Sequence, residues 1–125
     1  MGVNNTTIGG PDIRLSSSAT EVLMMVLFEL VTNAAKYGAF STLQGQVCVT
    51  WNGIADGSSL KSVAIEWRES GGPLVVAPTR SGYGITLIRE LIPYELGGTV
   101  DLVLPPEGVS CRIVFPLKPL RDNDR

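Results

Sequence analysis

Three polar side chains occur at helical spacing within an otherwise apolar stretch, residues 28–38. Glu29, Asn33 and Lys36 are four and then three residues apart, so a helix would project them from neighbouring turns on one side. An acid, an amide and a base arranged in this way suit a hydrated divalent cation and the phosphates beside it. Taken alone, this spacing is more typical of a solvated helix face, so the interpretation depends on the rest of the chain.

The second polar feature is a glutamate at the end of a strand-like run. Glu69 is followed closely by Gly71 and Gly72, which allow a sharp turn and the close approach of a ligand. A carboxylate in such a place can accept a hydrogen bond from an exocyclic amine such as that of adenine. By itself, the same pattern more often marks a salt-bridged surface glutamate before a turn.

The third feature is the glycine-rich run RSGYG at residues 80–84. Gly82 and Gly84 lead into a helical pattern, where free N–H groups favour phosphate, and Arg80 can add a charge-assisted contact. A lone G-x-G is commonly no more than a glycine-rich helix start. In chain order, however, the first feature suits a metal with its phosphates, the second suits a base, and the third suits further phosphate contacts. Together they predict a purine nucleoside triphosphate bound with Mg²⁺.

The bulk composition narrows the classes of function. A chain of 125 residues with a net charge of −2 forms one domain and offers no basic surface for nucleic acid. It has no histidine, which excludes Ser-His-Asp and Cys-His catalysis by this chain and argues against a protein zinc site. Cys48 and Cys111 are expected to be small buried hydrophobic residues. Glu21 and Glu29 bracket the longest apolar run, so no membrane contact is expected, and the polar start predicts a cytoplasmic domain.

The elements that position these residues follow from periodicity and turn signals. A helix is predicted at residues 19–37, after an N-cap at 16–18 and before a C-cap at Gly38. The remaining predictions are strands at 12–15, 46–51, 63–67, 99–104 and 109–115, a hairpin turn at 52–59, an irregular segment at 70–83, and a helix from about 82–85 to 92. The expected fold is an α/β two-layer sandwich, with a mixed, mostly antiparallel sheet packed on helices. It spans residues 11–118, between flexible segments at 1–10 and 119–125.

Several of these motifs resemble those of one protein family. ELVTNAAKYGAFS resembles the N box of the ATP-binding domain of sensor histidine kinases, which has the Bergerat fold shared with the type II topoisomerase ATPases. WRESGGP stands where the adenine-contacting D-x-G-x-G motif usually lies, and SGYG resembles the later glycine box. The motifs are most similar to the HWE subfamily, in which the first glycine box is built around W-x-E. The ending GGTVDLVLPPEGVSCRIVFPL fits that subfamily's last hairpin, so the resemblance extends from about residue 10 to 117.

The resemblance implies a role for each matching residue. It implies that Asn33 coordinates Mg²⁺, that Glu29 is the catalytic polar residue, and that Glu69 takes the adenine-binding place. The remaining implied contacts are Lys36 and Tyr37 beside the phosphates or ribose, Gly71 and Gly72 around the pocket, Arg80, Gly82 and Gly84 at the phosphates, and a short lid at residues 73–81. The implied cofactors are ATP and Mg²⁺.

Two departures from the family pattern matter. Phe28 stands where the subfamily's N box has its histidine, and the chain lacks a phosphoacceptor histidine on a dimerisation helix pair. The implied function is transfer of the γ-phosphoryl group of Mg-ATP to a histidine on a separate dimerisation domain of the same kinase, which would then serve a response regulator. The alternative is an ATP-binding regulatory module, pseudokinase or anti-sigma-like, that acts through protein contacts. A plain α/β domain without a ligand would require three coincidences in order.

Overall fold

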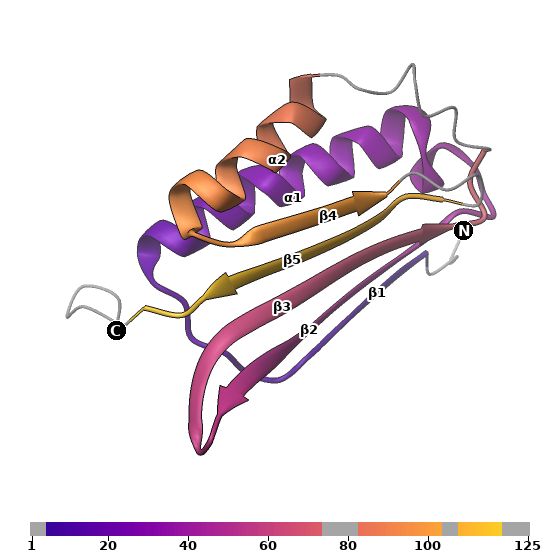
Figure 1. Cartoon of the computed structure of the whole chain (residues 1–125). Helices are drawn as coiled ribbons and strands as arrows, with labels where there is room; N and C mark the ends of the chain where they lie inside the picture. The colour runs from indigo at the N-terminus through magenta and orange to yellow at the C-terminus, as the bar shows by residue number, and fades with distance from the viewer. Residues whose placement is uncertain (1–4, 74–82, 104–107, 119–125) are drawn as a thin grey trace.

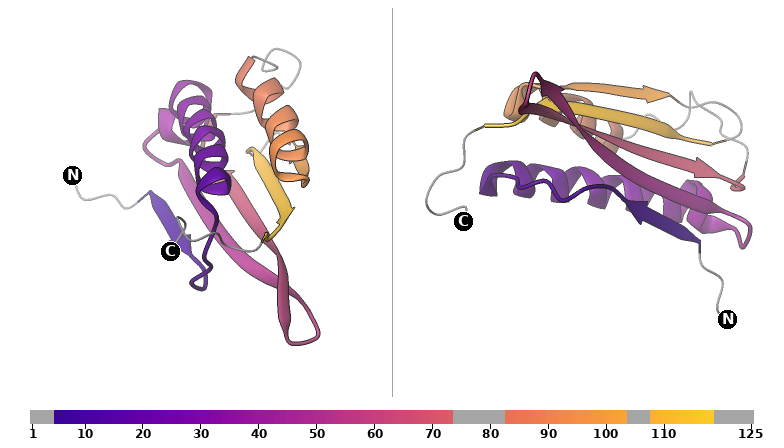
Figure 2. Two further views of the ribbon diagram at one scale, coloured as in Figure 1. Left: turned by 90° about the vertical axis from the view of Figure 1, so that its left-hand side faces the viewer. Right: turned by 90° about the horizontal axis from the view of Figure 1, so that it is seen from below.

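The computed structural model describes residues 5–73, 83–103 and 108–118, with side chains in the second helix described from residue 86 onward. In chain order, the elements are β1 (Thr6–Gly9), α1 (Ser17–Tyr37), a 3₁₀ turn η1 (Ala39–Ser41), β2 (Gln46–Asp56), β3 (Ser59–Ser70), α2 (Tyr83–Leu96), β4 (Thr99–Val103) and β5 (Ser110–Pro116). Both helices cover one face of a single sheet (Figure 1 and the left view of Figure 2). The predicted two-layer α/β sandwich is therefore confirmed.

The sheet has five strands in the order β1-β2-β3-β5-β4. β1 runs parallel to β2, and every other neighbouring pair is antiparallel, as a mixed and mostly antiparallel sheet requires. α2 and β4 separate β3 from β5 in the sequence, yet these two strands are neighbours in the sheet. The chain therefore leaves the end of β3, passes through the helical layer and returns to the same sheet.

Helix α1 has a defined start and a defined end. The hydroxyl of Ser16 accepts a hydrogen bond from the Ala19 amide at 3.2 Å, as in an N-cap. Gly38 donates its N–H to the Ala34 carbonyl at 3.0 Å and closes the last turn. The predicted helix and its C-cap are thus confirmed, with a start at Ser17 instead of residue 19.

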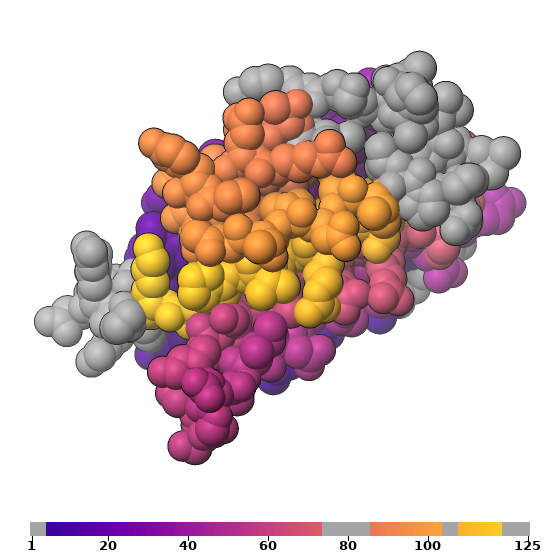
Figure 3. All heavy atoms as spheres, in the orientation of Figure 1, coloured from indigo at the N-terminus to yellow at the C-terminus, as the bar shows by residue number. Residues whose placement is uncertain are grey.

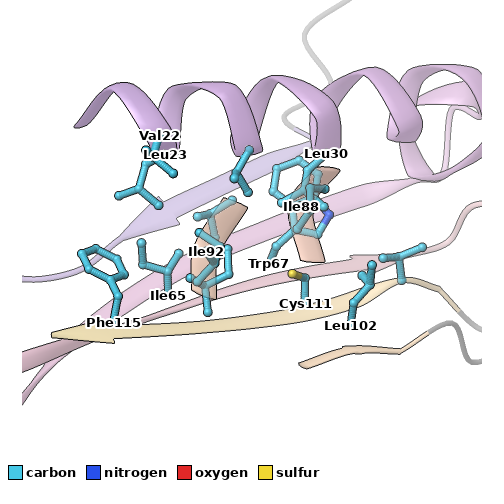
Figure 4. Close-up of a cluster of buried hydrophobic side chains, with 14 of the residues drawn as sticks. Val22, Leu23, Leu30, Ile65, Trp67, Ile88, Ile92, Leu102, Cys111 and Phe115 are labelled. Atoms are coloured by element: carbon cyan, nitrogen blue, oxygen red, sulfur yellow. The ribbon is translucent and has the colours of Figure 1, made fainter. Parts of the chain in front are cut away.

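The core lies between the two helices and the inner face of the sheet. Figure 4 shows side chains from α1 and α2 meeting those of β3 and β5. The predicted alternation in the third strand holds, because Val63, Ile65 and Trp67 are all buried. Ile88 and Ile92 of α2 are fully buried against them. Removal of this apolar surface from water is the main stabilising term of the fold.

The β2–β3 hairpin is longer than predicted. Its turn is confined to residues 57–58, with Gly57 at φ 67°, so the predicted turn at 52–59 is wrong for most of its length. Residues 52–56 are all exposed, and β5 pairs with β3 only from Ser62 onward, which lies opposite Ile54. Beyond that point the hairpin projects from the body of the protein (Figures 1 and 3).

The N-terminal edge strand is also displaced from its predicted place. Residues 12–15 form no strand; the edge strand is Thr6–Gly9, which pairs in parallel with β2 from Val47 to Thr50. The prediction of a flexible segment at 1–10 is therefore wrong for residues 6–9. The alternation at 12–15 has another cause, because Ile13 and Leu15 pack partly buried against the core from an irregular segment. Residues 1–4 and 119–125 lie outside the described residues.

Two further expectations need correction. Cys111 is buried as expected, but Cys48 is exposed on the outer face of β2. By length and composition, Ser17–Lys36 of α1 would suffice to span a membrane, contrary to the expectation that no apolar run is long enough. Here the apolar residues of this helix have another use, since Val26, Leu30 and Ala34 are buried against the sheet. A long core helix can therefore be as apolar as one that spans a membrane.

Candidate functional site

The three polar residues of α1 lie along one flank of the helix. Glu29 and Asn33 are half-buried, whereas Lys36 in the last turn is exposed, as is Tyr37. The observed helix confirms that the three share one side, because residues three and four apart are neighbours on a helical surface. Their oxygen and ammonium groups therefore form a stripe that ends beside Gly38.

Glu69 lies at the end of β3 and points into the protein. It is only 9% exposed, on the same face of the strand as the core residue Trp67. Its Oε2 accepts the indole N–H of Trp67 at 2.8 Å, and its Oε1 accepts the backbone N–H of Ala39 at 3.0 Å. Glu69 is thus not a salt-bridged surface residue, because it is buried and each oxygen of its carboxylate accepts an N–H group.

The Ala39 contact brings two of the predicted features together. Ala39 follows directly after the C-cap of α1, so the hydrogen bond joins the end of the polar helix to the end of β3. Sequence reasoning missed both partners of Glu69. The Trp67 partner had a signal, since residues two apart on a strand face the same side. The Ala39 amide had none, because any residue type carries a backbone N–H.

Glycines allow this close approach. A Cβ at Gly38 would overlap Oε1 of Glu69, and one at Gly72 would lie 2.9 Å from the Ala39 Cα. Gly71 has φ 72°, and its carbonyl accepts the Thr42 hydroxyl at 3.0 Å. Gly71 and Gly72 therefore make room for the protein's own backbone after α1.

The predicted phosphate cradle is described only in part. Gly84 belongs to α2, one residue after that helix begins at Tyr83. Arg80 and Gly82 lie outside the described residues, as does most of the segment expected to form a lid. The helix start is therefore confirmed as an element, and contacts made by Arg80 and Gly82 stay predictions.

The sequence has close relatives among curated proteins, although no protein-family model matches it. It is 33% identical over 116 residues to a blue-light-activated histidine kinase of Brucella ovis. The aligned region covers 93% of this chain and 24% of that relative. A protein of the same name from Brucella anthropi is 34% identical over 119 residues, and this alignment covers 90% of this chain and 24% of that relative. The chain thus spans about a quarter of the length of these relatives, 24% in each.

Solved structures decide the fold. The nucleotide-free catalytic domain of histidine kinase ThkA matches with a TM-score of 0.68 at 19% identity, over 92% of this chain and 80% of that one. The chain has the fold of a histidine kinase catalytic domain. The histidine kinase domain of the Erythrobacter litoralis blue-light-activated kinase matches with a TM-score of 0.66 at 16% identity, over 94% of this chain and 53% of that one. The family resemblance of the motifs agrees with both comparisons.

The polar residues of this histidine kinase fold suit Mg²⁺ in their chemistry. Asn33 and Glu29 carry hard oxygen donors one turn apart on α1. Within the described part of the chain, no group of three or more acidic, cysteine or histidine residues could hold a metal ion. Asn33 and Glu29 would supply one or two oxygens, with phosphates and water in the other positions. Mg²⁺ is commonly bound in this way beside nucleotides.

A separate cavity of about 480 Å³ lies on the opposite flank of α1. Its walls are almost wholly apolar and come from β1, β2, β3, the segment before α1, and α1 itself. Leu27 and Val31 line it from the helix, and none of the described candidate site residues does. This apolar cavity is therefore distinct from the predicted nucleotide site.

The buried thiol offers no reactive group. Burial, with a further contribution from nearby Asp101 and a smaller opposing one from Arg89, raises the pKa of Cys111 to about 12. A thiol protonated at neutral pH is a poor nucleophile. Cys111 is therefore a core residue, in agreement with its predicted role.

Proposed function

We propose that this chain is the ATP-binding catalytic domain of a two-component sensor histidine kinase of the HWE type. In this proposal it binds Mg-ATP and transfers the γ-phosphoryl group to a histidine on the dimerisation domain of the same kinase. The observation that carries the proposal is the Glu69–Ala39 hydrogen bond, which unites a strand-end carboxylate with the helix bearing Glu29 and Asn33. The kinship with named histidine kinases and the shared fold support it.

Each described residue has a role that suits its position. Asn33 would hold Mg²⁺ through its amide oxygen, and Glu29, one turn earlier, would orient the attacking imidazole. Lys36 and Tyr37 would lie beside the phosphates or ribose, and the N–H groups at the start of α2, near Gly84, would face phosphate. Bound Mg²⁺ neutralises charge that develops on the phosphates. The protein's part is mainly positioning and charge stabilisation, as in phosphoryl transfer generally.

The partners follow from the same chemistry. A crystal structure of histidine kinase ThkA in complex with the response regulator TrrA matches this chain with a TM-score of 0.66 at 21% identity, over 92% of this chain and 34% of that one. We therefore propose a response regulator as the indirect partner, reached through the phosphorylated histidine. We place the domain in the cytoplasm, where Mg-ATP is available.

Calorimetric titration tests nucleotide binding directly. A non-hydrolysable ATP analogue should bind saturably, at modest affinity, when Mg²⁺ is present and more weakly when a chelator removes it. No detectable heat at millimolar analogue would overturn the proposal.

Phosphorylation in trans separates a kinase from a regulatory module. A separately produced acceptor domain, supplied with labelled Mg-ATP, should gain an acid-labile phosphate. An acceptor with its histidine replaced by glutamine is the matched control. Nucleotide binding without any transfer to a competent acceptor would favour the module that acts through protein contacts.

A further inference from the structure

The carboxylate of Glu69 is held from two directions. The indole N–H of Trp67 reaches Oε2 and the Ala39 amide reaches Oε1, at 2.8 and 3.0 Å. Trp67 is itself 3% exposed and packed in the core between the sheet and the helices (Figure 4). Because its ring is almost wholly buried and its N–H is bonded to Oε2, the direction of that N–H is restricted as well. A glutamate side chain that would otherwise sample several rotamers is thereby restricted to one.

The surrounding backbone adds to this restriction. The missing side chain at Gly38 leaves the space that Oε1 occupies, and a Cβ at Gly108 would overlap the Glu69 carbonyl oxygen. The Glu69 amide donates to the Val109 carbonyl at 2.8 Å, so the main chain is also held. The carboxylate is thus fixed in position by its own strand, by a neighbouring loop and by the turn after α1.

A carboxylate held in this way discriminates between purines. Its two oxygens offer about four acceptor sites and no donor, and donors among the described residues use two of these sites. An amino group at purine position 6 can donate to a remaining site, whereas a 6-oxo group would place one acceptor against another. A purine without a substituent at that position makes no such contact. Polar sites of this kind discriminate because a mismatched partner leaves buried groups unpaired.

We propose that Trp67 is a positioning residue that holds Glu69 as a fixed acceptor and thereby sets the preference for a 6-amino purine. This inference rests on the proposed function and adds to it the residue that creates base specificity. Trp67 acts through Glu69 and does not itself touch the nucleotide.

The test compares two nucleotides on matched variants of this chain. Calorimetry with Mg²⁺ measures the dissociation constants of ATP and of purine riboside triphosphate, which lacks the 6-amino group. Trp67→Phe removes the N–H and keeps a ring, and should weaken ATP about tenfold while leaving the amino-free analogue nearly unchanged. Trp51→Phe is the matched control, because Trp51 donates its indole N–H to the Pro11 carbonyl at 2.6 Å and not to Glu69. In that control the ratio of the two constants should equal the wild-type ratio.

The outcomes separate positioning from general packing. Equal weakening of both nucleotides by Trp67→Phe, or an unchanged ratio, would overturn the inference and leave the proposed function standing. If the wild-type chain binds neither nucleotide, the proposed function falls and the inference with it.

A shape-preserving replacement covers the case in which Trp67→Phe does not fold. The chain has two tryptophans, so in a Trp51→Phe background only position 67 would incorporate benzothienylalanine, in which sulfur replaces the N–H. The same loss of discrimination is expected there, and a wild-type ratio would overturn the inference.

Discussion

Glu69 and Ala39 are 30 positions apart in the sequence and are joined by a buried hydrogen bond of 3.0 Å. This bond connects the turn that follows α1, the helix that carries Glu29, to the last residues of β3, which include Glu69. Breaking it would leave a buried carboxylate oxygen without its donor, which costs about 1–3 kcal/mol and more for a charged group. The alignment of the two halves of the site therefore depends on the residues that surround this bond.

Gly38→Ala should destabilise the protein by about 2 kcal/mol, because the new methyl group would overlap Oε1 of Glu69 and displace it. Urea unfolding followed by circular dichroism measures the change. Gly9→Ala is the matched control, since a Cβ there meets nothing within 4 Å and the cost should stay within about 0.5 kcal/mol. Equal stabilities of the two variants would contradict the observed packing.

Asn33→Ala should remove the dependence of nucleotide binding on Mg²⁺ and leave the fold intact, because Asn33 is only half-buried on a helix that alanine favours. Titrations with and without a chelator measure the effect. Asn52→Ala, at an exposed position on β2, should keep the wild-type dependence. A variant at position 33 that still responds fully to Mg²⁺ would remove this amide from the metal's coordination.

Phe28→His, which restores the residue typical of the resembled subfamily, should change neither stability nor nucleotide affinity. Phe28 is 68% exposed, and its position on α1 is turned away from Asn33, so nothing in the core or the polar stripe depends on its ring. Thermal unfolding and calorimetry check both. Phe115→His, at a fully buried position, is the contrasting control and should unfold the protein. A large gain in ATP affinity from Phe28→His would show that this side chain acts in the site.

The two cysteines should differ sharply toward a thiol reagent at pH 8. Exposed Cys48 should react at once, and Cys111 only after unfolding, since its pKa is raised to about 12. Two rapidly reacting thiols in the folded protein would contradict the buried position of Cys111.

Stability should also fall at alkaline pH through Cys111. Its pKa is above the ordinary value of 9.0, so between pH 9 and about 12 the unfolded chain loses this proton while the folded one keeps it. The contribution of the protonated Cys111 thiol to the free energy of unfolding is therefore complete below pH 9. It declines above pH 9, by at most about 1.4 kcal/mol per pH unit. Urea midpoints from pH 8 to 10.5 measure the slope, and Cys111→Ala should flatten it. Parallel slopes for the two proteins would contradict the prediction.

Much of the architecture could be predicted because buried residues repeat with the period of their element. Val63, Ile65 and Trp67 alternate on a strand, and Val26, Leu30 and Ala34 follow helical spacing, so both elements were found. The outer part of the hairpin was missed because it leaves the core, where alternation carries no signal. Thr6–Gly9 was missed for a related reason, since an exposed edge strand is held by backbone pairing to β2 and not by side-chain burial.

The candidate site could be predicted as a set of residue types and not as a geometry. The spacing of Glu29 and Asn33 follows from the helix alone, but the approach of Glu69 to Ala39 depends on glycines distant in the sequence. From the sequence, the glycines after Glu69 could make room either for a ligand or for the protein's own backbone. The structure shows the second for Gly71 and Gly72.

The hydrogen bond from Ala39 to Glu69 also provides a natural reporter of the site. An amide proton bonded to a carboxylate resonates at a position that depends on the charge and direction of its acceptor. If a second donor shares that carboxylate, the Ala39 signal in an NMR spectrum should move, although Ala39 itself need not touch the ligand. One backbone resonance would then reveal when the base is in place, without any label added to the protein's surface.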